Sequence, residues 1–318
     1  MLSSFAEMCS VKDVKRHSMV FSGFGDQIIS MPTAKREGVC LYYDHISGNS
    51  GGPPVLFIQG LGVGQWSWRW QRDALADRYD ILLPDNRGTG RSDAALPPII
   101  PRLPRLLRLL LFTKFAGYST EGLAADIEAV LSHAGVERAH IVGASLGGMI
   151  AQQYALDYDR AASLSLLCTT HGGEEALPIP DETVERIFDV SDDLDEREQI
   201  RHRMKPSLNE EFMKSNPETI EQIIDWRLEQ DAGEVVRESQ GAAGVNFDVA
   251  DRIHTIDVPT LIMHGTADQV VPVENGKLLA EKIEGSQFER FEGGSHLFMI
   301  EDSERVNESL QAFLQDVA

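Results

Sequence analysis

The stretch VGASLGG, residues 142–148, decides the fold of this chain. A run typical of a buried strand, AHIV at 139–142, leads into it, and a helix-forming run follows it. A glycine-x-serine-x-glycine pattern between a strand and a helix is typical of a tight turn that presents a serine hydroxyl. Gly143 and Gly147 lack the side chains that would collide in such a turn. The pattern therefore predicts that Ser145 lies at a helix N-terminus, where backbone N–H groups favour negative charge.

Apolar runs on either side of this stretch alternate with helical patterns. Short runs at 55–58, 80–84, 162–168 and 258–264 have the composition of strands that are buried on both faces. A further run at 38–44 alternates enough to be an edge strand. Strands that alternate with helices form parallel sheets through right-handed crossovers. The sequence therefore predicts an α/β fold, with a mostly parallel central sheet and helices on both faces.

The alternation of strands and helices is interrupted in one long segment. Acid-rich helical stretches without a strand-like run occupy 181–190, 195–204, 209–213 and 217–230. We expect a helical cap at 171–254, inserted into a core that residues 31–170 and 255–318 form. Residues 1–30 are predicted to be an N-terminal extension that the composition allows to be disordered.

The composition and the cysteine content bear on the cellular location of the protein. With 42% hydrophobic residues among 318, the chain can bury a large core, but no run reaches the ~20 apolar residues of a membrane span. Charged residues interrupt the first thirty positions, so these do not have the pattern of a signal peptide. Cys9, Cys40 and Cys168 are scattered and lack metal-binding spacing. We expect reduced thiols, no metal site and a cytoplasmic protein.

The charge balance is strongly acidic. Lys+Arg total 29 against 50 Asp+Glu, a formal net charge of −21, which disfavours binding to nucleic acid. Few lysines beside many carboxylates are typical of proteins from salt-loving microbes, although an ordinary acidic protein remains the alternative. Stability that rises with molar salt would support the halophilic hypothesis.

Residues 97–115 form the one cationic, leucine-rich segment of the chain. Prolines precede the run RLLRLLLF at 105–112, and no acidic residue occurs between Asp93 and Glu121. The segment fits a hydrophobic flap at the mouth of a pocket or an insertion packed on its own fold. A helix lying on a membrane interface is the less favoured alternative, so we expect no membrane contact.

A serine hydroxyl is a weak nucleophile until a base accepts its proton, and a carboxylate orients that base. In open α/β sheets, ligands gather outside the carboxyl ends of the strands. Asp268 and His296 lie in loops that follow strand-like runs, which gives the chain order Ser145, Asp268, His296. These three residues are the candidate catalytic residues, although an ordinary strand-to-helix turn could also contain Ser145.

Other histidines are weaker candidates for the base. Those in a strand, on a helix or in the cap are His140, His133 and His202. His264 and His171 are the closer competitors, because each closely follows a strand. Neither is paired with a carboxylate that is placed as well as Asp268.

Loops after two other strands carry glycine-rich sequences. The loop QGLGVG at 59–64 lacks the lysine or the acid of phosphate-binding motifs, so we interpret it as a donor of backbone N–H groups. Trp68 either lines a pocket or packs in the core. Asp85 and Arg87, in the loop after 80–84, are interpreted as structural.

These motifs together resemble the α/β-hydrolase superfamily across residues 33–316. The stretches that carry the resemblance are QGLG at 59–62, DNRGTGRSD at 85–93, GASLGG at 143–148, the Asp268 loop and GSH at 294–296. The chain is similar to small cofactor-free esterases and 3-oxoadipate enol-lactonases. Gln59 stands where many of these proteins have histidine, so the substrate of a relative with that histidine is a weaker guide to the substrate of this chain.

The resemblance implies a role for each matching residue. Ser145 would be the nucleophile, His296 the base and Asp268 its orienter, with the backbone N–H groups of Leu61 and Leu146 as the oxyanion hole. Trp68 is a further candidate for substrate contact.

The function that these assignments imply is hydrolysis of a carboxylic ester or lactone, a small-molecule substrate, through an acyl-enzyme intermediate without a cofactor. A perhydrolase or cofactor-free haloperoxidase with the same triad is one alternative. A ligand-binding protein on a hydrolase scaffold is the other. Neither the substrate nor the oligomeric state can be read from the sequence.

Overall fold

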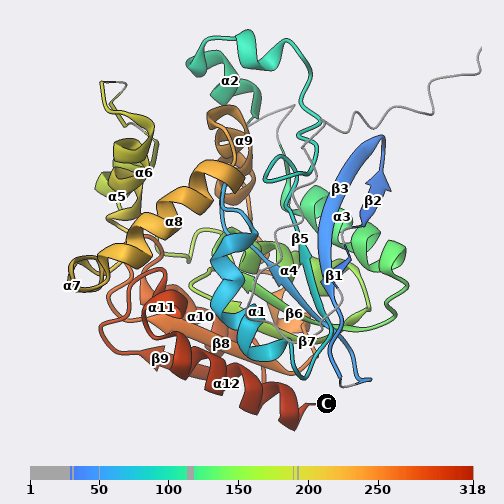
Figure 1. Cartoon of the computed structure of the whole chain (residues 1–318). Coiled ribbons are helices and arrows are strands. Elements are labelled where there is room, and N and C mark those ends of the chain that lie inside the picture. Colours follow the sequence, from blue (N-terminus) through green and yellow to red (C-terminus); the bar gives the residue numbers. More distant parts are fainter. Residues whose placement is uncertain are drawn as a thin grey trace, which may run out of the picture.

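The computed structural model describes residues 29–30, 32–49, 51–112, 118–188, 190–191 and 193–317. Its central sheet has the strand order β1-β3-β5-β4-β6-β7-β8-β9, with β2 paired to β3 (Figure 1). The strands are β1 (Ile29–Ser30), β2 (Thr33–Arg36), β3 (Val39–Ile46), β4 (Val55–Ile58), β5 (Ile81–Pro84), β6 (Ala139–Ala144), β7 (Ala161–Leu167), β8 (Thr260–Gly265) and β9 (Gln287–Phe291). β3 is antiparallel to its neighbours, whereas the pairs from β5 to β9 are parallel.

Helices cover both faces of the sheet, as predicted. Successive side chains of a strand point to opposite faces, and β4 shows the result. Leu56 and Ile58 pack in the cluster that contains α3, α4 and α10, whereas Val55 and Phe57 pack with α1 and α12. The helices of the core are α1 (Arg69–Leu75), α3 (Thr120–Ala134), α4 (Leu146–Asp157), α10 (Val273–Lys282), α11 (Phe298–Glu301) and α12 (Ser303–Asp316).

A group of helices occupies the chain between β7 and β8, where the sequence predicts a cap. They are α5 (Asp181–Phe188), α6 (Glu196–Met204), α7 (Glu210–Ser215), α8 (Pro217–Gln230) and α9 (Glu234–Val245). A bridge between Gly172 and Asp248 brings the two ends of this segment together. In Figure 1, α2 (Arg105–Leu111) lies next to α9, on the far side of the cap from α12.

The structure differs from the sequence predictions at several positions. Residues 1–28 of the expected extension lie outside the described residues, but Ile29 and Ser30 already belong to the sheet as β1. β3 is not an edge strand, because β1, β2 and β5 all pair with it. The sequence did not predict α9, whose glycine and alanine content obscures an apolar pattern.

Two further observations concern the environment of the protein. Cys40 is disulfide-bonded, so the expectation of reduced thiols is wrong for this residue, whereas Cys168 is a buried free thiol. Spacing along the chain does not show which cysteines meet in space. Among the described residues, no helix has the length and apolar composition that crossing a membrane requires.

Candidate active site

Ser145 lies on a strained turn between β6 and α4, the elbow of residues 143–147. Its φ of +56° and ψ of −121° place a non-glycine residue in a region that costs about 1–3 kcal/mol. A Cβ atom at Gly143 would overlap the carbonyl oxygen of Gly147, and one at Gly147 would overlap that of Ile58. Both flanking positions therefore need glycine, and the half-buried serine precedes the first turn of α4.

Asp268 and His296 form a hydrogen-bonded pair. The Asp268 Oδ2 atom lies 2.8 Å from His296 Nδ1, and Oδ1 accepts the N–H groups of Val270 and Val271 at 2.8 and 2.9 Å. Burial alone would raise the pKa of Asp268, but the neighbouring His296 and His264 hold it well below its usual value. A charged Asp268 that binds Nδ1 leaves Nε2 as the ring nitrogen that can exchange a proton.

The two loops that carry this pair are fixed to each other. β8 and β9 are parallel neighbours, so their carboxyl ends meet at one edge of the sheet. Ala267 N–H donates to the carbonyl oxygen of Gly294 at 2.9 Å, and Gly265 packs directly against the same peptide. The position of His296 relative to Asp268 is therefore set by backbone contacts.

The thiol of Cys168 lies beside this pair. Its sulfur, an Asp268 oxygen and a His296 nitrogen lie within 4.8 Å of one another. Cys168 follows Leu167, whose carbonyl oxygen accepts the Ser145 N–H at 2.9 Å, so the elbow and the Asp–His pair meet at this point. Burial and the nearby Asp268 raise the pKa of the thiol.

The loop after β4 lies against the elbow. A Cβ atom at Gly60 would lie 3.5 Å from Ser145 Cβ. Leu61 follows in this loop, and Leu146 is the first residue of α4, so its N–H has no acceptor within the helix. Within the described part of the chain, neither the Leu61 nor the Leu146 N–H donates a hydrogen bond. Two unpaired backbone donors therefore lie on either side of Ser145.

Trp68 packs in the core. Its side chain is fully buried, and its ring lies 5.0 Å from that of Phe57 on the face of the sheet that α1 and α12 cover. Trp68 is therefore a core residue, and it is not among the residues proposed to contact the substrate.

The competing histidines have other partners. His264 is fully buried, with Nε2 2.9 Å from the Val271 carbonyl oxygen and 3.4 Å from Asp268 Oδ2. It is therefore a second neighbour of Asp268, a role that the sequence interpretation missed although the two residues are four positions apart. His171 Nδ1 lies 2.7 Å from the Gly172 carbonyl oxygen. His140 is buried in β6, which lowers its pKa to about 4.

Asp85 and Arg87 hold the loop after β5. Asp85 Oδ2 accepts the Arg91 N–H at 2.9 Å, and burial raises the pKa of Asp85 to about 7. Arg87 binds both carboxylate oxygens of Asp126, at 2.5 and 2.8 Å. Both contacts are structural, as the sequence predicted.

Part of segment 97–115 packs on the cap, and residues 113–115 lie outside the described residues. Arg108 is buried in contact with α9, where Nε lies 2.7 Å from Glu238 Oε2 and Nη2 lies 2.7 Å from Glu234 Oε1. Leu106 and Leu110 are exposed on the outer side. The ion pairs fix α2 to α9, which agrees with an insertion packed on its own fold.

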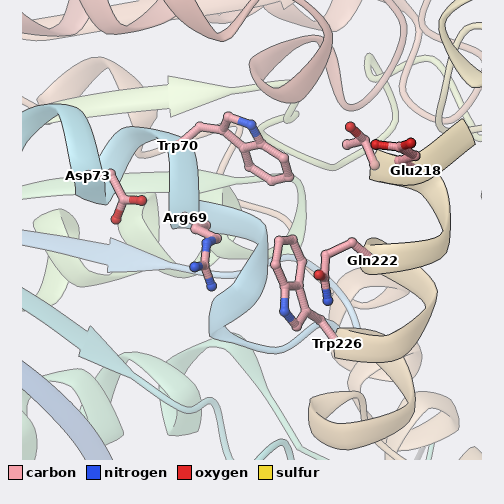
Figure 2. A pocket seen from close by; sticks show the side chains of 7 residues that line it. Arg69, Trp70, Asp73, Glu218, Gln222 and Trp226 are labelled. Atoms are coloured by element: carbon pink, nitrogen blue, oxygen red, sulfur yellow. The ribbon is translucent and has the colours of Figure 1, made fainter. Parts of the chain in front are cut away.

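An open groove lies between α1 and α8, and its lining does not include Ser145, Asp268 or His296. It has a volume of about 360 Å³, and the residues that line it are Arg69, Trp70, Asp73, Glu218, Thr219, Gln222 and Trp226. Figure 2 shows the Trp70 and Trp226 rings between the two helices; their centroids are 6.1 Å apart in an edge-to-face arrangement. The Arg69 guanidinium lies 4.8 Å from the Trp226 centroid. The groove is therefore a seam between core and cap.

Residues 53–303 match the family model of the alpha/beta hydrolase fold. The chain belongs to this family. The match spans the strands from β4 to β9, the elbow and the loops of Asp268 and His296. It confirms the fold class and the superfamily that the sequence indicated, and it identifies the chain as a hydrolase.

Individual relatives are similar at low identity. A protein of Caulobacter segnis with the provisional name carbamate hydrolase RutD is 27% identical over 90% of this chain and 99% of its own. A thermophilic esterase from Thermogutta terrifontis is 26% identical, with a TM-score of 0.70 over 92% of this chain and 99% of its own. The enol-lactonase from Burkholderia xenovorans LB400 has a TM-score of 0.71 over 89% of this chain and 100% of its own. At 23% identity, that likeness is one of fold.

Proposed function

We propose that this chain is a serine hydrolase that cleaves a carboxylic ester or lactone through an acyl-enzyme intermediate. The observation that carries the proposal is the Asp268–His296 hydrogen bond at the edge of the sheet that also holds the strained turn of Ser145. A buried carboxylate that orients a histidine near a half-buried serine hydroxyl is the arrangement that activates serine. The unpaired N–H groups of Leu61 and Leu146 would supply electrostatic stabilisation of the oxyanion.

In the proposed reaction, His296 Nε2 accepts the Ser145 proton while Oγ attacks the carbonyl carbon. The tetrahedral oxyanion accepts hydrogen bonds from Leu61 and Leu146 N–H, each worth about 3–4 kcal/mol of transition-state stabilisation. His296 then donates its proton to the leaving alkoxide. Water, activated by the same histidine, releases the acid from Ser145. These steps need neither a metal nor an organic cofactor.

The substrate class draws support from the Thermogutta terrifontis esterase, which is 26% identical. Because one relative is named as a carbamate hydrolase, carbamates are also useful test substrates. Ser145 Oγ can attack a carbamate carbonyl carbon in the same way as an ester carbonyl carbon. Location in the cytoplasm and adaptation to high salt stay predictions. The net charge of −21 supports the latter.

The test is turnover of p-nitrophenyl esters of increasing chain length, several lactones and a p-nitrophenyl carbamate. We expect Ser145→Ala to reduce turnover of the best substrate by at least about 10³-fold, since the nucleophile is lost. A fluorophosphonate probe should label the wild type and not this variant. Ser132→Ala, on the surface of α3, is the control. Wild-type turnover or labelling by Ser145→Ala would refute the proposal.

A further inference from the structure

Helix α9 of the cap is bonded directly to the loop after β4. The Gln240 side chain is fully buried, and its Oε1 accepts the Gly62 N–H at 2.7 Å. Its Nε2 donates to the Arg87 carbonyl oxygen at 3.0 Å. Because both ends of the carboxamide are bonded, its orientation is fixed. One cap side chain therefore joins the loops that follow β4 and β5.

The chain between α8 and α9 binds the same loop. Ala232 N–H donates to the Gly62 carbonyl oxygen at 2.9 Å, so the cap holds both backbone polar groups of Gly62. Asp231 Oδ1 accepts from Gly64 N–H at 3.1 Å and from the Trp66 indole N–H at 2.9 Å. Backbone hydrogen bonds of this loop are therefore satisfied by the cap rather than by the sheet.

Glycines of α9 allow a close approach to both proposed oxyanion donors. A Cβ atom at Gly241 would lie 3.6 Å from Leu61 Cδ1, and one at Gly244 would lie 3.7 Å from Leu146 Cδ1. The same face of α9 that carries Gln240 thus lies over the residues that flank Ser145.

We propose that Gln240 is a positioning residue for the oxyanion hole, an inference that rests on the proposed function. Gly62 directly follows Leu61, so fixing the Leu61–Gly62 peptide limits the backbone rotation that would turn the Leu61 N–H away from Ser145. Oxyanion donors stabilise the transition state because they are aligned before the reaction, and a displacement of about 1 Å can cost about 10²-fold. The cap therefore contributes to the chemical step.

The experiment compares Gln240→Met with wild type on a p-nitrophenyl ester. Methionine keeps the length of the side chain and removes both hydrogen bonds. We expect kcat per active site, titrated with a fluorophosphonate, to fall about 10- to 100-fold while KM changes less than about threefold. Inhibition by a boronic acid, which mimics the tetrahedral state, should weaken by a similar factor. A purely structural role would lower the titrated fraction and leave kcat per site unchanged.

Gln153→Met is the matched control, because the Gln153 side chain is also buried but, among the described residues, hydrogen-bonds only to Asp157 of its own helix. We expect its kcat to stay within about twofold of wild type. Gln240→Glu keeps the acceptor for Gly62 N–H, so it should retain more activity than Gln240→Met. It also carries the test if the methionine variant does not fold. In that case a kcat per site below wild type with unchanged KM supports the proposal.

Wild-type kcat and boronate affinity in the folded Gln240 variant would overturn this inference alone, provided that Ser145→Ala is inactive. Turnover that survives in Ser145→Ala would instead overturn the proposed function, and this inference with it.

Discussion

The edge of the sheet that carries Asp268 and His296 holds charged side chains differently from the cap. At the edge, the Asp268 carboxylate is buried, and two backbone N–H groups and His296 bind it. On the outer cap helices, Arg197 bonds Glu221 and Asp225 in pairs that remain close to half exposed. Hydrogen bonds hold a buried charge in a single geometry. Exposed ion pairs are screened by solvent and contribute little to the free energy of unfolding.

Helix α9 resembles the edge more than the rest of the cap. Glu238, Ser239 and Gln240 are all buried, and each is hydrogen-bonded to a segment outside the cap helices. We therefore expect the effect of a cap substitution to depend on burial with a defined partner rather than on distance from the sheet. The following variants test this ranking.

The largest effect is expected for Asp268→Asn. Asparagine can present N–H to Nδ1 and stabilise the wrong ring tautomer, so kcat on a p-nitrophenyl ester should fall by about 10³- to 10⁴-fold. Asp225→Asn, which removes an exposed cap charge, should stay within about twofold. Comparable losses in both variants would remove the distinction between edge and cap.

The same variant has a pH signature. Because the pKa of Asp268 is lower in the fold than its unfolded value of about 3.9, its charge stabilises the fold above that pH. This contribution diminishes as the pH falls further toward the folded-state pKa. We expect the Tm difference between wild type and Asp268→Asn to be constant near neutral pH and to shrink below about pH 4. A difference that stays constant down to about pH 3 would contradict this.

An intermediate effect, on stability, is expected for Arg108→Leu. The change leaves Glu238 buried with one fewer partner, which should cost about 3 kcal/mol in the free energy of unfolding. Arg102→Leu makes the same substitution at an exposed position of the same segment and should cost less than about 0.5 kcal/mol. Urea denaturation measures both. Equal costs would show that the α2–α9 ion pair contributes nothing specific.

The smallest effect on activity is expected for Trp226→Leu in the groove of Figure 2. Loss of the contacts with Arg69 and Trp70 should lower the free energy of unfolding by about 1–2 kcal/mol. Turnover of the ester should stay within about twofold, since Ser145 does not line the groove. A tenfold change in kcat would instead assign the α1–α8 seam a role in the reaction.

Much of the fold could be predicted because its signals are local. Buried strands such as 55–58 are continuous apolar runs. The elbow needs glycine at two fixed positions, and a short window of sequence is enough to recognise both. Asp268 and His296 were found because each follows a strand, and parallel strands end at one edge.

What the sequence could not show depends on residues that are distant along the chain. Gln240 and Gly62 are 178 positions apart, and no pattern marks either as a partner of the other. Helix α9 escaped prediction because glycines that allow close packing also weaken the helical signal. β1 was not predicted because a strand of two residues is too short to show a period. The pairing of β3 with β1 was missed for the same reason.

The sequence by itself therefore determined the family, the alternation of strands and helices in the core, and the three candidate catalytic residues, because glycine turns and apolar periodicity act over a few residues. Tertiary structure alone decided that Trp68 packs in the core and that His264 lies beside Asp268. It also placed α9 on the loop of Leu61. Those outcomes depend on which distant surfaces exclude water together, and burial of that kind leaves no local mark on the chain.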